Sequence, residues 1–164
     1  GAVCNQDEAF SMRLTTRTNL AVRVLMFCAV HEGRIVRSAQ IAERCNASPH
    51  HLAQVVYLLN QRGFVRAIRG RAGGLELARP PAKINIGEVF ELFESGVPFA
   101  ECFSKTGNNC PLTDACRLRT GIARAVAAFY AEMGTLTLED LVKGNCALAA
   151  LMALEELPET ACAE

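Results

Sequence analysis

Three cysteines lie close together in the second half of the chain, and their spacing could bind a metal. Cys102, Cys110 and Cys116 follow the pattern C-x7-C-x5-C within the stretch CFSKTGNNCPLTDAC. Thiolates are soft ligands that select zinc, copper(I) or iron–sulfur clusters. Zinc and cubane iron–sulfur sites usually have four protein ligands, so three cysteines leave one position to another ligand. The alternative is a group of reduced thiols, or a redox switch based on disulfides.

The composition indicates that these cysteines are reduced. The chain has 164 residues and eight cysteines, and 51% of its residues are hydrophobic. No apolar run reaches the roughly 18 residues that a membrane-spanning helix needs, and no secretory signal is recognisable. We therefore expect a soluble, cytoplasmic protein whose cysteines are ligands, sensors or buried side chains rather than a disulfide framework.

Charge is divided unevenly along a chain whose net charge is zero. Residues 12–80 contain eleven arginines and three acidic residues, whereas residues 81–164 contain six basic and twelve acidic residues. The first part has the sign needed to bind a polyanion such as nucleic acid. A dipolar globule without a nucleic-acid partner is the alternative.

Residues 38–61 predict two short helices joined by a tight turn. Ser38 can cap the first helix, and Ser48 with Pro49 has the residue types favoured at the N-cap and first position of the second helix. The second helix has an apolar face with helical spacing, formed by Leu52, Val55, Val56 and Leu59. Two short helices joined in this way form a helix-turn-helix.

The polar face of the second helix could contact DNA. His50, His51 and Gln54 lie away from its apolar face and near its N-terminal end, where a recognition helix presents side chains to base edges. Glutamine can bind adenine through two hydrogen bonds, and histidine can donate to bases or phosphates. A solvated polar face explains the helix equally well when it is considered alone.

The segment that follows favours DNA binding. Residues 64–68 and 75–77 predict two short strands, and the turn between them carries Arg69 and Arg71 among three glycines. Glycines permit a tight hairpin, and a hairpin directly after a recognition helix is a wing. Arginines at the tip of a wing fit the narrow minor groove, where the negative potential is deepest.

The expected fold is mostly α-helical with a small β-wing. Residues 85–94 predict an amphipathic helix, residues 112–133 a long helix with apolar side chains on more than one face, and Thr137 a capped short helix. We expect a tail at 1–11, a winged helix-turn-helix domain at 12–97, a cysteine loop at 98–117, a dimerisation helix and C-terminal helices at 112–154, and a flexible tail at 155–164. Cys28 lies on an apolar helical stripe and is expected in the core.

Enzymatic motifs are not recognisable in this sequence. It has no glycine-rich phosphate loop, no Ser-His-Asp arrangement and no paired carboxylates in a familiar setting. Its three histidines, His31, His50 and His51, all lie in the half expected to bind DNA. We therefore predict a binding protein and not an enzyme.

Several motifs, in the right order, resemble the iron–sulfur winged-helix repressors, a family that includes NsrR (nitric oxide sensing), RirA (iron sensing) and IscR (cluster homeostasis). The resemblance runs from residue 12 to about residue 154. It rests on MRLTTRTNLAVRVLMFCAV, IAERCNASPHHLAQVVYLLNQRGFVRAIRGRAGGLELARP, INIGEVFELFE, ECFSKTGNNCPLTDACRL and AFYAEMGTLTLEDLV. CNASPHHLAQVV and NNCPLTDACRLR are most similar to the NsrR branch.

The resemblance implies a homodimeric transcriptional repressor that binds a double-stranded DNA operator. Nitric oxide would release it from the operator by nitrosylating its cluster, as would loss of the cluster. Cys102, Cys110 and Cys116 would bind this cluster, which is expected to be [4Fe–4S] in preference to [2Fe–2S]. The implied DNA contacts are Thr15, Ser48, His50, His51, Gln54, Arg69 and Arg71.

One residue departs from the NsrR pattern. A carboxylate from the first helix of the other subunit can complete the cluster in NsrR-like proteins, whereas the matching residue here is Asn19. The partner subunit's Asn19 would be a weaker ligand, and RirA-like sequences also have asparagine at this point. Three hypotheses follow: a nitric-oxide-sensing cluster repressor, an iron-responsive cluster repressor, and a cluster-free thiol sensor.

Overall fold

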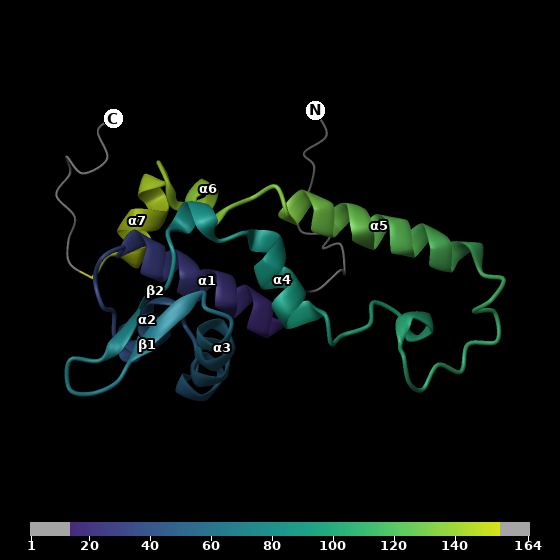
Figure 1. Ribbon diagram of the computed structural model, residues 1–164, viewed down its shortest axis with the longest axis horizontal. Helices are drawn as coiled ribbons and strands as arrows, with labels where there is room; N and C mark the ends of the chain where they lie inside the picture. The colour runs from purple at the N-terminus through teal and green to yellow at the C-terminus, as the bar shows by residue number, and fades with distance from the viewer. Residues whose placement is uncertain (1–13, 155–164) are drawn as a thin grey trace, which may run out of the picture.

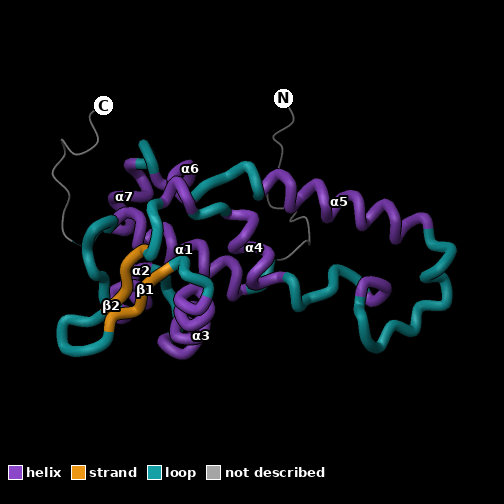
Figure 2. The backbone as a smooth tube through the Cα atoms, in the orientation of Figure 1, coloured by secondary structure: helices purple, strands orange, loops and turns teal. Residues whose placement is uncertain are grey.

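The computed structural model describes residues 14–154, so the tails expected at 1–11 and 155–164 lie outside the described residues. The chain is mostly helical with one small sheet, which confirms the predicted fold class (Figures 1 and 2). Its elements are α1 (Thr16–Val30), α2 (Ser38–Arg44), α3 (Pro49–Gln61), β1 (Val65–Ile68), β2 (Gly74–Leu77), the 3-10 helix η1 (Pro81–Lys83), α4 (Ile86–Glu94), the 3-10 helix η2 (Glu101–Phe103), α5 (Arg117–Met133), α6 (Leu138–Val142) and α7 (Cys146–Met152).

A hydrophobic core joins the helix-turn-helix to the helices that surround it. The apolar face predicted for α3 is buried at Leu52, Val55 and Leu59 and half-buried at Val56. It packs with side chains from α1, α2, the sheet, α4 and α6; the largest fully buried ones are Phe27, Leu25, Ile41, Leu75, Ile84 and Leu138. The burial of these side chains, which is the main stabilising term in folding, holds α3 and the hairpin in place.

Two helices begin at positions other than those predicted. The N-cap of α2 is Arg37, whose backbone N–H donates to the Gln40 side chain at 2.9 Å, so Ser38 is the first helical residue and not the cap. The long helix α5 begins at Arg117 and not at Leu112. Residues 111–115 form turns instead, since the Thr113 hydroxyl donates to the Cys110 carbonyl at 2.8 Å.

Glu94, at the end of α4, binds the N-terminal end of α1. Its Oε1 accepts hydrogen bonds from the backbone N–H and the hydroxyl of Thr15, both at 2.9 Å, and from the hydroxyl of the fully buried Thr18. A carboxylate at a helix N-terminus also interacts favourably with the helix dipole. Glu94 therefore joins α4 to the start of α1 through groups 79 residues apart in the chain.

Replacing Glu94 should destabilise the fold. Glu94→Ala removes three hydrogen bonds to a charged group and leaves the buried Thr18 hydroxyl with only its bond to the Thr15 hydroxyl, so we expect the free energy of unfolding to fall by about 2–3 kcal/mol. Glu91→Ala is the matched control, because Glu91 is an exposed glutamate of the same helix. Urea unfolding of both variants measures the difference; equal stabilities would contradict this role of Glu94.

The loop that holds the cysteines runs outward from the end of α4, and the helix α5 runs back alongside it, so that both extend away from the rest of the chain (Figure 1). Helix α5 meets α4 through the rings of Phe90 and Phe129, whose centroids are 5.8 Å apart. None of its residues, all of which are described, is fully buried, and Leu118 is 70% exposed. A single chain therefore leaves the apolar surface of this helix largely uncovered.

Between residues 14 and 154, none of the helices has the length and apolar character needed to cross a membrane.

Candidate nucleic-acid interface and cysteine loop

The structure places the predicted recognition residues on the exposed face of α3. Ser48 caps this helix by accepting a hydrogen bond from the His51 backbone N–H at 3.2 Å. His50, His51 and Gln54 are all exposed at its N-terminal end. The side chains of His50 and Gln54 are hydrogen-bonded to each other, with their Nε2 atoms 3.0 Å apart. Both side chains therefore present their remaining polar atoms outward as a pair.

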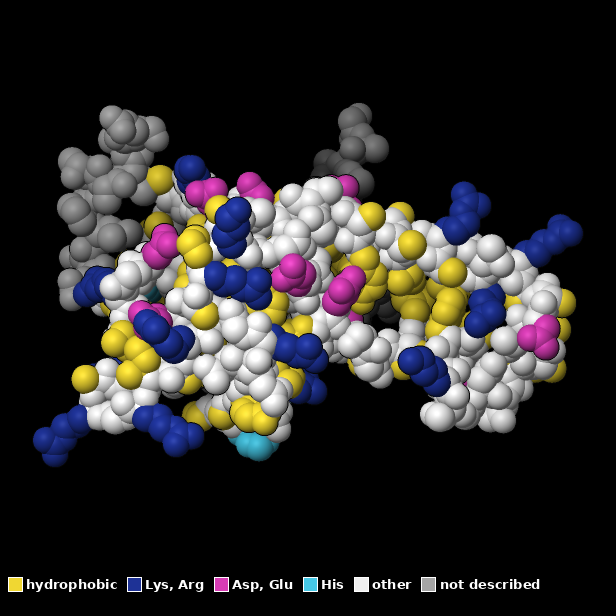
Figure 3. Space-filling view, in the orientation of Figure 1, with side chains coloured by type: hydrophobic (Ala, Val, Ile, Leu, Met, Phe, Trp, Pro, Cys, Tyr) yellow, Lys and Arg dark blue, Asp and Glu magenta, His cyan; other side chains and the backbone are white. Residues whose placement is uncertain are grey.

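The predicted wing is a two-stranded antiparallel hairpin. Its strands pair in a register that runs from Val65 opposite Leu77 to Ile68 opposite Gly74. The turn requires glycine: Gly70 has a φ of 104°, and a Cβ on Gly73 would lie 2.3 Å from the Ile68 carbonyl oxygen. Arg69 and Arg71 are both exposed in this turn. Figure 3 shows basic side chains projecting from the hairpin on the same side of the molecule as the exposed histidine side chains of α3.

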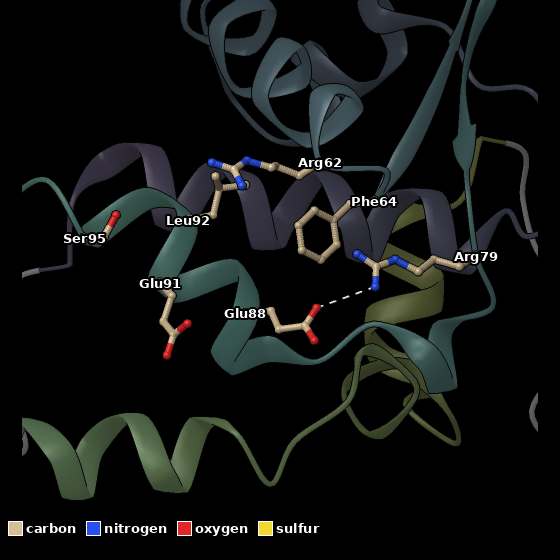
Figure 4. Close-up of a pocket in the computed structure, with 7 residues that line it drawn as sticks. All are labelled: Arg62, Phe64, Arg79, Glu88, Glu91, Leu92 and Ser95. Atoms are coloured by element: carbon tan, nitrogen blue, oxygen red, sulfur yellow. Dashed lines mark ion pairs between the residues drawn. The ribbon is translucent and has the colours of Figure 1, made fainter.

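The base of the wing is bonded to both neighbouring helices. The Asn60 side chain of α3 accepts a hydrogen bond from the Ala67 backbone N–H at 2.9 Å. Arg79, which follows β2, lies over the Phe64 ring at 4.4 Å and pairs with Glu88 of α4 at 3.5 Å (Figure 4). Phe64, Arg79 and Glu88 border a cavity of about 410 Å³ between the wing base and α4. The orientation of the wing is thus coupled to α4.

Two residues predicted from the resemblance lie at the start of α1. Thr15 is its half-buried N-cap, and its hydroxyl is already bonded to Glu94 and Thr18. Asn19 is exposed on the next turn of the same helix. A phosphate contact at Thr15 and a cluster contact from the partner subunit's Asn19 stay predictions.

The three cysteines of the loop are free and half-buried. Cys102 lies in η2, Cys110 lies in the loop, and Cys116 is the N-cap of α5 through its Sγ, which accepts from the Arg119 backbone N–H at 3.4 Å. The Arg119 side chain donates to the Cys102 carbonyl at 3.1 Å. Arg119 therefore connects the first and third cysteine segments, a role that no sequence motif indicated.

A second contact connects the first and second cysteine segments. The Asn109 backbone N–H donates to the Glu101 carboxylate at 2.6 Å, one residue before each of Cys110 and Cys102. All three segments are thus tied to one another by polar contacts. Three reduced thiols on such a loop have the donor chemistry that an iron–sulfur cluster needs. Within residues 14–154 of the single chain, however, no three His, Cys, Asp or Glu side chains are gathered closely enough to bind a metal ion.

Two other free cysteines belong to the core. Cys28 and Cys45 are both buried, as predicted for Cys28. Burial, and secondarily the neighbouring Cys45, raises the pKa of Cys28 from about 9 to about 12. Burial also raises the pKa of Cys45, which Arg23 partly offsets. These thiols are therefore protonated at neutral pH and poor ligands, because the thiolate is the form that binds metals.

The raised pKa of Cys28 predicts alkaline instability. Between pH 9 and 12 the unfolded chain loses the Cys28 proton and the folded chain keeps it, so stability should fall with rising pH by about 1.4 kcal/mol per unit from this residue. Cys28→Ala should give a shallower decline in urea unfolding of the reduced protein between pH 9 and 11. Val24→Ala, which alters a buried side chain of the same helix that does not titrate, should keep the wild-type slope. An unchanged slope in Cys28→Ala would show that this thiol is not the cause.

A helix-turn-helix followed by a two-stranded wing defines a winged-helix protein, a class whose recognition helix binds DNA. The Rrf2 family, described as "Iron-dependent Transcriptional regulator", matches residues 14–144. The chain belongs to the Rrf2 family of transcriptional regulators. This confirms the predicted family resemblance and the prediction that the protein is not an enzyme.

Individual relatives agree with this assignment. The HTH-type transcriptional regulator NsrR of Geobacillus kaustophilus (strain HTA426) is 40% identical over 142 residues, 86% of this chain and 97% of the relative. Among solved structures, T. potens IscR has a TM-score of 0.62 at 26% identity, over 80% of this chain and 86% of IscR. CymR, the global cysteine regulator of B. subtilis, has a TM-score of 0.57 at 26% identity, over 79% of this chain and 95% of CymR.

Proposed function

We propose that the protein is a cytoplasmic, homodimeric transcriptional repressor whose DNA binding depends on an iron–sulfur cluster and responds to nitric oxide. The observation that carries this proposal is the set of three free, half-buried cysteines on a loop anchored to α5, in a chain that also presents a recognition helix and an arginine-tipped wing. The similarity to NsrR supports nitric oxide as the signal.

DNA binding would use the exposed groups of α3 and the wing. Gln54 and His50 would face base edges in the major groove, while Arg69 and Arg71 would enter the adjacent minor groove. Ser48 lies at the N-terminus of α3, where backbone N–H groups and the helix dipole favour phosphate. Thr15 is proposed as a phosphate contact from the family resemblance alone, because the Glu94 carboxylate already occupies the N-terminus of α1. A dimer would place two recognition helices about one helical turn of DNA apart, roughly 34 Å.

The surface of α5 supports a homodimer. A hollow of about 890 Å³ lies between α5, the end of α4 and the segment that follows it, and its lining is mostly apolar. Phe99 and Val97 are exposed in this lining, and Leu118 is exposed at the start of α5. Figure 3 shows hydrophobic side chains gathered on the part of the molecule that α5 and the preceding loop form. Large apolar patches of this kind on soluble proteins mark interaction surfaces. A second copy of α5 would cover it.

Cys102, Cys110 and Cys116 would hold the cluster, with [4Fe–4S] favoured over [2Fe–2S]. When bound, the cluster would supply iron that reacts with nitric oxide, and three cysteine ligands would leave one of its four irons without a protein thiolate. The chain's own residues connect this loop to the DNA-binding surface. The loop follows α4, and α4 is bonded to the wing base through Glu88 and Arg79 and to α1 through Glu94. We propose that a change in the loop reaches the wing and the start of α1 through these contacts.

Two alternatives each have an observation in their favour. An iron-responsive repressor is favoured by Asn19 in place of a carboxylate, and the family description is consistent with it. A thiol redox sensor is favoured by the free state of the three loop thiols and by their separation in the described chain. Both alternatives keep DNA binding; the first changes only the signal, and the second also removes the cluster.

Selection of DNA from a random-sequence pool tests the proposal. Protein reconstituted anaerobically with iron and sulfide should enrich a two-fold-symmetric site with half-sites one helical turn apart. The metal-free protein should enrich it less. Equal enrichment by both forms would favour a cluster-independent repressor, and enrichment by neither form would reject the assignment as a DNA-binding regulator of this type.

A further inference from the structure

We propose that Tyr57 and Gln61 form a phosphate contact that extends the DNA-binding surface of α3 beyond its N-terminal end. This inference rests on the proposed DNA binding and adds a site to it. Tyr57 is 62% exposed, which makes it one of the large hydrophobic side chains that the fold leaves uncovered. Its neighbours on the buried side of the same helix, Val55 and Leu59, are fully buried. The aromatic ring thus points away from the core.

Helical spacing places Tyr57 in line with the predicted recognition residues. It lies three residues after Gln54 and seven after His50, so the three side chains share one face of α3. Gln61 lies four residues further along, and its Nε2 donates a hydrogen bond to the Tyr57 hydroxyl at 3.2 Å. The outer face of α3 therefore carries two hydrogen-bonded side-chain pairs in succession, His50 with Gln54 and Tyr57 with Gln61.

The second pair has the donor arrangement that a phosphate needs. The Tyr57 oxygen accepts a hydrogen bond from Gln61, so its own O–H proton is left to donate to another group. Gln61 also holds the ring in one orientation, which lowers the entropy cost of ordering it on binding. Phosphate oxygens only accept hydrogen bonds, and tyrosine is among the side chains that commonly donate to them.

The position of Tyr57 favours the backbone over a base edge. It lies about 10 Å along the helix axis from His50, at 1.5 Å per residue. The major groove is roughly 8.5 Å deep, so a helix that enters by its N-terminal end brings Tyr57 to the rim of the groove. The rim is formed by the phosphate backbone. Tyr57 would therefore contribute affinity and register, not sequence preference.

The charge of the side chain gives this contact a distinct signature. Each phosphate neutralised by a lysine or arginine contributes about 0.9 to the slope of log K against log salt. Tyrosine is neutral and releases no counterion. Loss of the Tyr57 hydroxyl should therefore weaken binding equally at every salt concentration, whereas loss of an arginine contact should reduce the slope.

Fluorescence anisotropy with a labelled random-sequence duplex of about 30 base pairs tests the proposal, because a phosphate contact needs no operator. The full-length, anaerobically reconstituted wild type is compared with Tyr57→Phe and with Thr135→Val, a control that removes an exposed hydroxyl between α5 and α6. Tyr57→Phe should bind about three- to tenfold more weakly with an unchanged salt slope, the size expected of one neutral hydrogen bond. Affinity equal to that of Thr135→Val, or a reduced slope, would overturn the contact. A wild type that does not bind the duplex would instead reject the proposed DNA binding.

Tyrosine fluorescence gives a second test that does not depend on affinity. The chain has two tyrosines and no tryptophan, so Tyr130→Phe leaves Tyr57 as its sole tyrosine. Acrylamide should quench this emission readily in the free protein, because the ring is exposed. Binding of the duplex should protect it. Equal quenching in the free and bound states would show that Tyr57 lies away from the DNA.

Discussion

Cys110→Ser should almost abolish the iron and sulfide bound after anaerobic reconstitution, and with them the response of DNA binding to nitric oxide. A serine hydroxyl is a hard, protonated group and a poor substitute for a thiolate on iron. Cys102→Ser and Cys116→Ser should have the same effect. Because all three residues are half-buried and lie at the loop or at the start of α5, we expect the variants to fold.

Cys45→Ala is the matched control for these variants. Cys45 is also free, but it is buried at the end of α2 and its pKa is raised by burial. Its variant should keep the full iron and sulfide content. If the three loop variants retained as much iron as Cys45→Ala, the loop cysteines would not be cluster ligands, and the thiol-sensor alternative would gain support.

The double variant Arg69→Ala/Arg71→Ala should bind DNA much more weakly than the wild type. Each arginine contact is worth about 1–3 kcal/mol, so the combined loss should exceed tenfold. The salt slope should fall by about 0.9 for each phosphate that an arginine no longer neutralises. The loss should be greatest on duplexes with A·T-rich minor grooves, which are narrow and strongly negative. Titrations across salt concentrations on A·T-rich and G·C-rich duplexes measure both effects.

Arg124→Ala supplies the control for charge. Arg124 is an exposed arginine of α5, on a helix that extends away from the wing. Its variant removes a positive charge without touching the hairpin and should bind almost as the wild type does. An equal loss on all duplexes in the double variant would identify the wing arginines as plain phosphate contacts. No loss at all would remove the wing from the DNA interface.

The parts of this fold that were predicted from sequence have local causes. The α3 helix begins at Pro49 as predicted, because Ser48 accepts a backbone hydrogen bond from its first turn. The hairpin is predictable because glycines mark its turn, and the structure shows that Gly70 and Gly73 are needed there. The burial of Cys28 followed from its place on an apolar helical stripe.

The parts that were missed depend on contacts between distant residues. Glu94 caps α1 from the far end of α4, and Arg119 joins segments 17 residues apart. Neither contact could be predicted from the residues that are adjacent in the sequence. The start of α5 was misplaced for a similar reason, since a side-chain contact between Thr113 and Cys110 favours turns where helical spacing alone continues. The spacing of the three loop cysteines likewise does not determine how close their thiols lie, and within residues 14–154 no three His, Cys, Asp or Glu side chains are gathered closely enough to bind a metal ion.

We claim above all that the state of the cysteine loop controls the DNA-binding surface. Duplex binding, followed while nitric oxide is added anaerobically to reconstituted protein of known iron and sulfide content, measures this control. We predict about four irons per chain, as in a cubane cluster, and release of the selected DNA site in proportion to the nitric oxide added. DNA binding that is unchanged by nitric oxide in fully loaded protein would contradict the claim.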